Sequence, residues 1–187
     1  HLVGLRLVEG LAFQQRAGLR RTQMELGSDA LTAYIVSIAA EAGYEIPEYS
    51  KKRMEKGLVG FVEGRVVRYS ALPTADLAIR KVAALAALSR GDTEINPRWL
   101  DGFSIEPNLW PTSAVIDWYT LLKHAPNLPQ ADTRRAEAEQ ILRARLNFQG
   151  TIMTFSTERS DALWWLMNST DQNANRLLIA MLEQDNW

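Results

Sequence analysis

The stretch of residues 28–48 constrains the fold most, because it specifies one helix together with both of its ends. Ser28 is a good N-cap, since its hydroxyl can accept a hydrogen bond from a free backbone N–H one turn later, and Asp29 adds negative charge at the positive end of the helix dipole. Gly43 can end the helix in a left-handed conformation, and Pro47 can open the next helix. Between these ends, apolar residues recur at spacings of three and four and share one face: Leu31, Tyr34, Ile35, Ile38 and Ala42.

The same pattern of one-faced helices separated by proline or glycine continues along the chain and predicts about nine helices. Each helical hairpin has one face too apolar to stand alone, so neighbouring hairpins must stack. An open solenoid and a closed α/α toroid both fit this pattern. We therefore expect one all-α domain over residues 1–187. The predicted helices cover residues 2–16, 28–42, 48–63, 72–89 and 131–147, with others that begin near 96, 111, 160 and 171.

Residues 150–155 form the only β-like run in the sequence. The run alternates poorly between apolar and polar residues, so we interpret it as an extended connector, with at most a short pairing near residues 151–155. Elsewhere the helical stripes predict the core. The side chains expected there are Tyr34, Ile38, Leu85, Trp118 and Trp165.

Composition narrows the range of functions. The net charge of −1 provides no electrostatic footprint for nucleic acid or an anionic membrane. The absence of cysteine excludes disulfides, a cysteine nucleophile and cysteine-based metal sites. The two histidines, His1 and His124, are too few for a histidine-based zinc site without help from carboxylates. We therefore expect no metal, no cofactor and no nucleic-acid partner.

Part of the helical pattern resembles a signature of the bacterial alpha-2-macroglobulin family. Leu-Thr-Ala-Tyr-Ile-Val at residues 31–36, Glu-Ala-Gly-Tyr at 41–44 and Ile-Pro-Glu at 46–48 carry the resemblance. They are similar to a Trp-Leu-Thr-Ala-Tyr-Val helix followed by Ala-Gly-Tyr-x-Val-Pro. Weaker similarity covers most of the chain. Ala30 stands where that family usually has tryptophan, which indicates a divergent branch.

The resemblance implies an α/α toroid of the thioester type, similar to those of complement proteins and terpenoid cyclases. It also implies that this toroid is incomplete, truncated at both ends. The parent would be a secreted or periplasmic bait-and-trap inhibitor of endopeptidases, or one anchored to a membrane through the parent chain. The implied partners are proteases, met by the full-length parent, and other macroglobulin domains of the same chain. Without cysteine this chain cannot hold the family's Cys–Gln thioester, so it would be a non-catalytic structural part.

The carboxylates leave a second function open, because an α/α toroid can also host a lyase or glycosidase. An inverting glycosidase needs two carboxylates held apart around a water molecule. Glu106 with Asp117, and Glu158 with Asp161, are acid pairs that are close in sequence. Helix caps and first-turn acids account for Glu158 and Asp161 without catalysis.

The tryptophans and His124 complete the set of candidates. Trp99 and Trp110 border a loop and are the best candidates for a surface that stacks on sugars, whereas Trp118 belongs to a helical stripe. His124 lies at a predicted helix end, where a histidine complements the helix dipole. An α-solenoid scaffold that binds peptides is a further alternative. The main expectation remains that the chain carries no catalytic, cofactor-binding or metal-binding residue.

Overall fold

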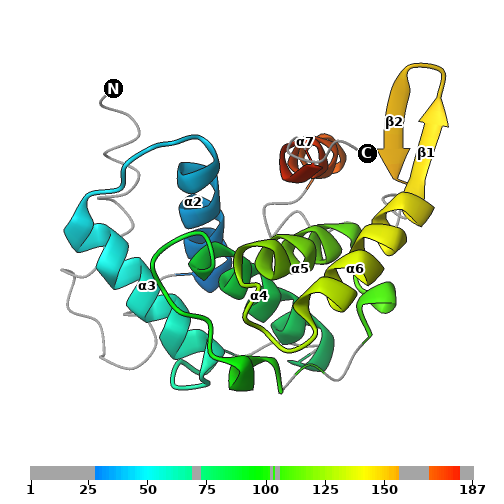
Figure 1. The fold of residues 1–187 in the computed structure, drawn as a ribbon. Helices are drawn as coiled ribbons and strands as arrows, with labels where there is room; N and C mark the ends of the chain where they lie inside the picture. Colours follow the sequence, from blue (N-terminus) through cyan, green and yellow to red (C-terminus); the bar gives the residue numbers. More distant parts are fainter. Residues whose placement is uncertain (1–27, 69–72, 102, 104–105, 156–168, 182–187) are drawn as a thin grey trace.

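The structure is a computed structural model that describes residues 28–68, 73–101, 103, 106–155 and 169–181. Within these residues the chain is mostly helical, as predicted, with six α-helices, two short 3₁₀-helices and one β-hairpin (Figure 1). The predicted helix over residues 2–16 and the helix start at 160 lie outside the described residues. The elements are α2 (Asp29–Glu41), α3 (Glu48–Val62), α4 (Pro73–Leu88), η2 (Pro97–Leu100), η3 (Pro107–Leu109), α5 (Thr112–His124), α6 (Ala131–Arg145), β1 (Leu146–Gln149), β2 (Ile152–Phe155) and α7 (Thr170–Met181).

α2 begins and ends where the sequence predicts. Ser28 Oγ accepts a hydrogen bond from the N–H three residues later, at 3.2 Å. At the other end Gly43 has a φ of 66°, a left-handed conformation that glycine adopts at little steric cost. The N–H of Tyr44 then donates to the carbonyl of Ala39 at 2.8 Å, which satisfies a carbonyl at the helix end. Local chemistry alone therefore fixes both ends of this helix.

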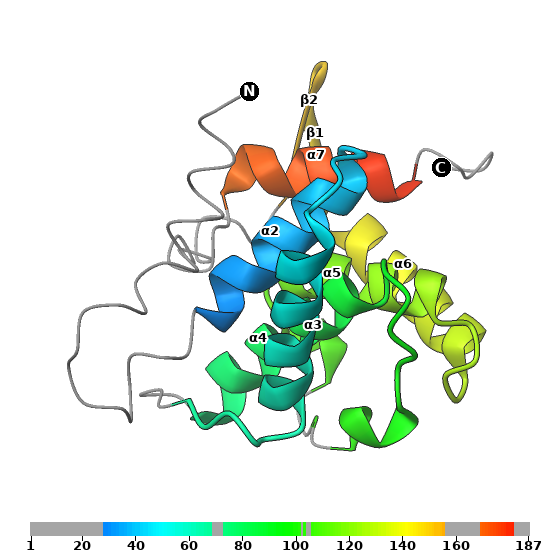
Figure 2. The ribbon, with the colours of Figure 1, turned by 90° about the vertical axis from the view of Figure 1, so that its left-hand side faces the viewer.

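Four helices form a row in which each packs against the next. α2 packs on α4, α4 on α5, and α5 on α7. α3 packs against both α2 and α4, and α6 packs against α5. Every residue of α5 from Thr112 to Leu122 is buried, which makes this helix the centre of the described fold. Figures 1 and 2 together show α7 lying across α5 rather than along it.

One continuous cluster of buried side chains runs from α2 to α7 and forms the core. Leu85 on α4 is completely buried and Trp118 on α5 has an exposed fraction of 5%, which confirms both predictions. The prediction is wrong for Tyr34 and Ile38, whose exposed fractions are 36% and 37%. Trp165 lies outside the described residues.

The face of α2 that is buried is not the face that carries Tyr34 and Ile38. The buried residues of this helix are Asp29, Ala33, Val36 and Ser37. Small side chains on this face let α2 approach α4 closely. Asp29 is also held by Arg80 of α4, with 2.5 Å between Oδ1 and Nη2. Together these contacts fix the rotation of α2, which leaves Tyr34 and Ile38 at the protein surface.

Residues 146–155 form a β-hairpin, where the sequence predicts the end of a helix and then a connector. α6 ends at Arg145, and β1 pairs with β2 in antiparallel fashion, with Phe148 opposite Met153 and Gln149 opposite Ile152. Gly150 has a φ of 64° at the first position of the two-residue turn, a place that suits glycine in a type II′ hairpin turn. The short pairing expected near residues 151–155 is therefore confirmed. Its partner strand takes the last residues of the predicted helix.

Candidate functional site

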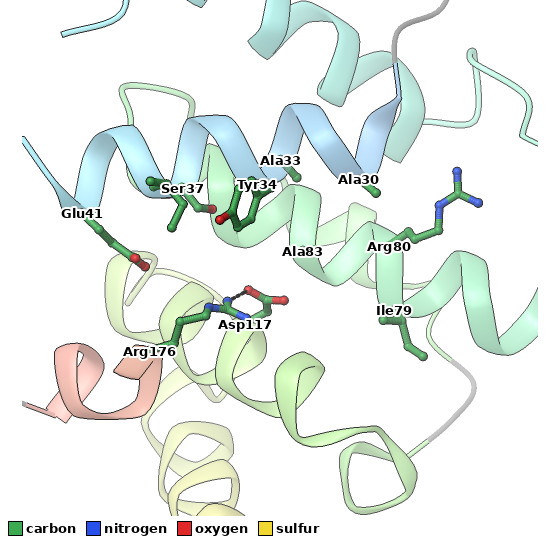
Figure 3. Close-up of a pocket in the computed structure, with 11 residues that line it drawn as sticks. Ala30, Ala33, Tyr34, Ser37, Glu41, Ile79, Arg80, Ala83, Asp117 and Arg176 are labelled. Atoms are coloured by element: carbon green, nitrogen blue, oxygen red, sulfur yellow. Dashed lines mark hydrogen bonds and ion pairs between the residues drawn. The ribbon is translucent and has the colours of Figure 1, made fainter. Parts of the chain in front are cut away.

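A small hollow lies between α2, α4, α5 and α7, and Figure 3 shows the side chains around it. Its volume is about 40 Å³. Sites for drug-sized ligands have volumes of about 300–1,000 Å³, so the hollow is much too small for an organic substrate of that size. The polar part of its lining comes from four elements and includes Ser37, Glu41, Arg80, Asp117 and Arg176.

Asp117 and Arg176 form an ion pair in this hollow. The exposed fractions of their side chains are 10% and 11%. Asp117 comes from α5 and Arg176 from α7, and Nη2 of Arg176 donates to Oδ1 of Asp117 (Figure 3). A guanidinium group stays protonated throughout the pH range of folded proteins, so its charge always compensates the carboxylate. The pair therefore ties α7 to α5 by a charge-assisted hydrogen bond.

Glu41 and Arg90 form a second buried ion pair, between the end of α2 and the segment after α4. The exposed fractions of their side chains are 11% and 9%. Arg90 also donates from Nη1 to Ser37 Oγ at 3.3 Å. Burial lowers the pKa of Arg90, as does the positive charge of Arg176, while the charges of Glu41 and Asp117 act in the opposite direction. The two ion pairs are thus close enough to influence each other electrostatically.

A third group of charges surrounds Asp29 at the start of α2. Arg80 donates to Asp29 through two nitrogens, with Nε to Oδ2 at 2.8 Å and Nη2 to Oδ1 at 2.5 Å. Its remaining terminal nitrogen reaches Asp76 at 3.0 Å, and Arg68 Nε lies 3.0 Å from Asp29 Oδ1. Burial acts to lower the pKa of Arg80, but the bonds and charges of Asp29 and Asp76 outweigh it, so this pKa is raised. The side chain of Asp29, only 4% exposed, is therefore enclosed by two arginines.

The structure does not bring Glu106 and Asp117, one of the acid pairs that the sequence suggested, together in one hollow. Asp117 is bonded to Arg176 in the hollow, whereas the exposed Glu106 lies in a different groove, which Trp118 also lines. Glu158 and Asp161 lie outside the described residues. A glycosidase pair would hold both carboxylates around one water molecule, whereas Asp117 and Glu106 line different hollows.

The aromatic side chains near the loop form a packed cluster. The Trp110 and Trp118 ring centroids are 5.7 Å apart at an interplanar angle of 89°, and Phe103 meets both rings edge to face. Trp110 has an exposed fraction of only 4%, so it does not form the surface platform for which it was a candidate. Edge-to-face packing is favourable for aromatic rings and hides their faces from a sugar. Trp99 is half-buried and packs against the core.

His124 is the last residue of α5, next to Lys123, in the position that the sequence predicts. The residues missed by the sequence analysis are the arginines Arg80, Arg90 and Arg176. Each pairs with an acid far away in the chain, and only Arg80 also has a partner at a local spacing, Asp76 four residues earlier, which does not reveal its contact with Asp29. Among the described residues, no three side chains of the types His, Cys, Asp and Glu are grouped as ligands for a metal ion.

No family model, curated protein or solved structure matches this chain. None of the helices in the described part of the chain has the length and apolar character needed to cross a membrane.

Proposed function

We propose that this chain is a non-catalytic, structural part of the thioester-type domain of a bacterial alpha-2-macroglobulin-like endopeptidase inhibitor. The observation that carries the proposal is the helix–glycine–proline–helix unit of α2 and α3. Its sequence is the part that resembles the family, and Gly43 and Pro47 occupy the turn positions for which that sequence is suited. The proposed partners are proteases, through the parent, and the other domains of the parent chain. The proposed location is periplasmic or secreted, with membrane anchoring only through the parent.

The arrangement of helices supports an α/α toroid as the fold of the complete domain. α2, α4, α5 and α7 pack in sequence as one layer, while α3 and α6 pack against members of that layer. A toroid alternates inner and outer helices along the chain. The runs α2–α3–α4 and α5–α6–α7 each follow this alternation, whereas α4 and α5 lie in the same layer with only η2 and η3 between them in the chain. We propose α2, α4, α5 and α7 as inner helices of an incomplete ring and α3 and α6 as outer ones.

The pairing of buried charges supports a structural role rather than catalysis. Asp29, Glu41 and Asp117, whose side chains are largely buried, all form ion pairs with arginines. Such pairs hold helices in place and keep both charges fixed. The glycosidase alternative needs two carboxylates placed around a water molecule, whereas Asp29 and Asp117 are each bonded to an arginine.

The decisive experiment uses the full-length parent protein. It is incubated with endopeptidases, and residual activity is measured on a small peptide and on a large protein substrate. A trap abolishes cleavage of the large substrate and preserves cleavage of the small one, because the enclosed protease remains active. Leu85→Asp should destroy this selectivity by placing a charge in the core of α4, whereas Lys52→Met at an exposed position should preserve it. Unchanged cleavage of both substrates by the wild type would refute the proposal.

The 187-residue chain provides a second test, of the non-catalytic role alone. Incubation with methylamine should leave its intact mass unchanged, because it has no cysteine to form a thioester. A panel of polysaccharides should remain uncleaved. Turnover that disappears on Asp117→Asn would instead assign the hollow to an enzyme and overturn the structural role.

A further inference from the structure

The hairpin formed by β1 and β2 lacks the features that normally protect the edge of a sheet. Residues 146–155 include no charged residue and no proline. Natural proteins protect exposed edge strands with such residues, because free backbone groups can pair with another chain. Phe148 and Ile152 are also largely exposed, with exposed fractions of 65% and 63%. An uncharged, apolar hairpin of this kind is suited to contact with another strand.

β1 is the open edge of this two-stranded sheet. β2 packs against α7, whereas Figure 1 shows β1 on the side of the hairpin away from α7. The same view shows the hairpin projecting beyond the helical body, with its turn farthest from the other elements. Another strand could therefore approach β1 without displacing any helix of the described residues.

The register of the hairpin identifies the backbone groups that face outward. Gln149 and Ile152 flank the two-residue turn, so they form the hydrogen-bonded pair that closes it. Phe148 and Met153 then form a non-hydrogen-bonded pair, in which the N–H and C=O groups point away from the partner strand. Phe148 thus presents a donor and an acceptor at the open edge, together with an exposed ring.

We propose that β1 pairs with β1 of a second copy of this chain, antiparallel and about a two-fold axis at Phe148. The Phe148 N–H of each copy then donates to the Phe148 carbonyl of the other, which joins the two hairpins into a four-stranded sheet. A two-fold contact requires the same surface on both copies, and an edge without charge brings no like charges together. The two aromatic rings meet on one face of the new sheet and supply apolar contact.

This edge is short, so the association is weak and concentration-dependent. Stable interfaces bury about 1,200–2,000 Å² in total, more than one pair of four-residue strands provides. A disulfide cross-link between the two copies is therefore the most sensitive test, because it captures a weak association. The chain has no cysteine, so Phe148→Cys introduces its only thiol. Directly opposed residues of a hydrogen-bonded pair have Cα atoms about 5.5 Å apart, within the range of about 4.4–6.8 Å for a disulfide.

Thr154→Cys is the matched control. Thr154 is in the same hairpin but on β2, so in the proposed sheet its two copies are three strand spacings apart, about 14 Å. Mild oxidation, followed by intact mass measurement without reductant, should give the Phe148→Cys dimer at least about ten times faster than the Thr154→Cys dimer. Equal rates for the two variants would overturn the proposal.

Sedimentation tests the same edge without a cross-link. The mean mass of the wild-type chain should rise with concentration, and Phe148→Asp should abolish the rise, because it places two negative charges opposite each other. Circular dichroism should show unchanged helix content, since Phe148 is exposed. A wild type that remains monomeric at the highest concentration, or a Phe148→Asp variant that associates equally well, would refute pairing through β1.

Discussion

The Asp117–Arg176 pair provides a quantitative test of what holds α7 on α5. Removal of one partner of a buried ion pair typically costs about 3–5 kcal/mol, because the other charge is left unpaired. Asp117→Leu leaves Arg176 close to the buried Arg90, and the charges of these two arginines already oppose each other. Arg176→Met leaves Asp117 near Arg90, which partly compensates its charge. We therefore expect each single variant to cost about 3–5 kcal/mol, with the smaller loss for Arg176→Met.

The double variant distinguishes stability lost because a charge is left unpaired from stability lost because core packing is disturbed. With both charges replaced by apolar side chains, no unpaired charge remains, and stability should return to within about 1 kcal/mol of the wild type. Urea unfolding followed by circular dichroism provides all four free energies of a double-mutant cycle. Lys52→Met is the control, because Lys52 pairs with Glu48 at 3.0 Å on an exposed surface. Its unfolding midpoint should not change.

The outcome of the cycle decides whether the reasoning holds. Additive losses, with the double variant as unstable as the sum of the two single variants, would show that the two charges are not coupled. Asp117→Leu no more harmful than Arg176→Met would show that Arg90 does not influence the pair. Either result would remove the electrostatic explanation for the placement of α7.

Two further predictions concern α4 and α5. Leu85→Ala empties a completely buried site and should cost about 2–5 kcal/mol in urea unfolding, whereas a loss below about 0.5 kcal/mol would mean that the site is not in the core. Burial raises the pKa of Tyr119, and the charge of Glu139 adds to the rise. An unfolded tyrosine ionises at about pH 10 while folded Tyr119 stays neutral, so stability is complete below that pH and falls as the pH rises toward the folded pKa. Tyr119→Phe should therefore lose less stability than the wild type between about pH 9 and about pH 11, and equal losses would contradict this.

Elements with local signals could be predicted from the sequence. Ser28 and Gly43 mark the two ends of α2 through side-chain capping and a left-handed backbone, and both effects act within one helical turn. Asn96 and Pro97 likewise predict the short helix η2, and the Asn96 side chain accepts a hydrogen bond from the N–H of Arg98 at 3.0 Å. The end of α6 could not be read in this way, because Leu146 fits the helical stripe as well as it fits a strand. Pairing with β2, a contact between segments, decides between them.

The charged site around the hollow could not be predicted, because its partners are distant in the chain. Arg80 is 51 residues from Asp29, Arg90 is 49 from Glu41, and Arg176 is 59 from Asp117. Surface arginines and buried arginines look alike in a single sequence. The sequence correctly predicted that Asp29 lies at the start of a helix. It did not predict that two arginines enclose this side chain.

The rotation of α2 shows which of two competing effects determines the structure. Burial of one large side chain such as Ile38 would contribute about 1.5–3 kcal/mol. To bury Tyr34 and Ile38, α2 would have to turn about its own axis, which would carry Asp29 away from Arg80 and Glu41 away from Arg90. Each buried charge left unpaired would cost about 3–5 kcal/mol, so loss of two ion pairs exceeds the gain from two apolar side chains. A periodicity analysis weights residues by hydrophobicity alone and therefore chooses the wrong face. The observed face is the one that keeps both ion pairs and brings Ala33 and Ser37 toward α4.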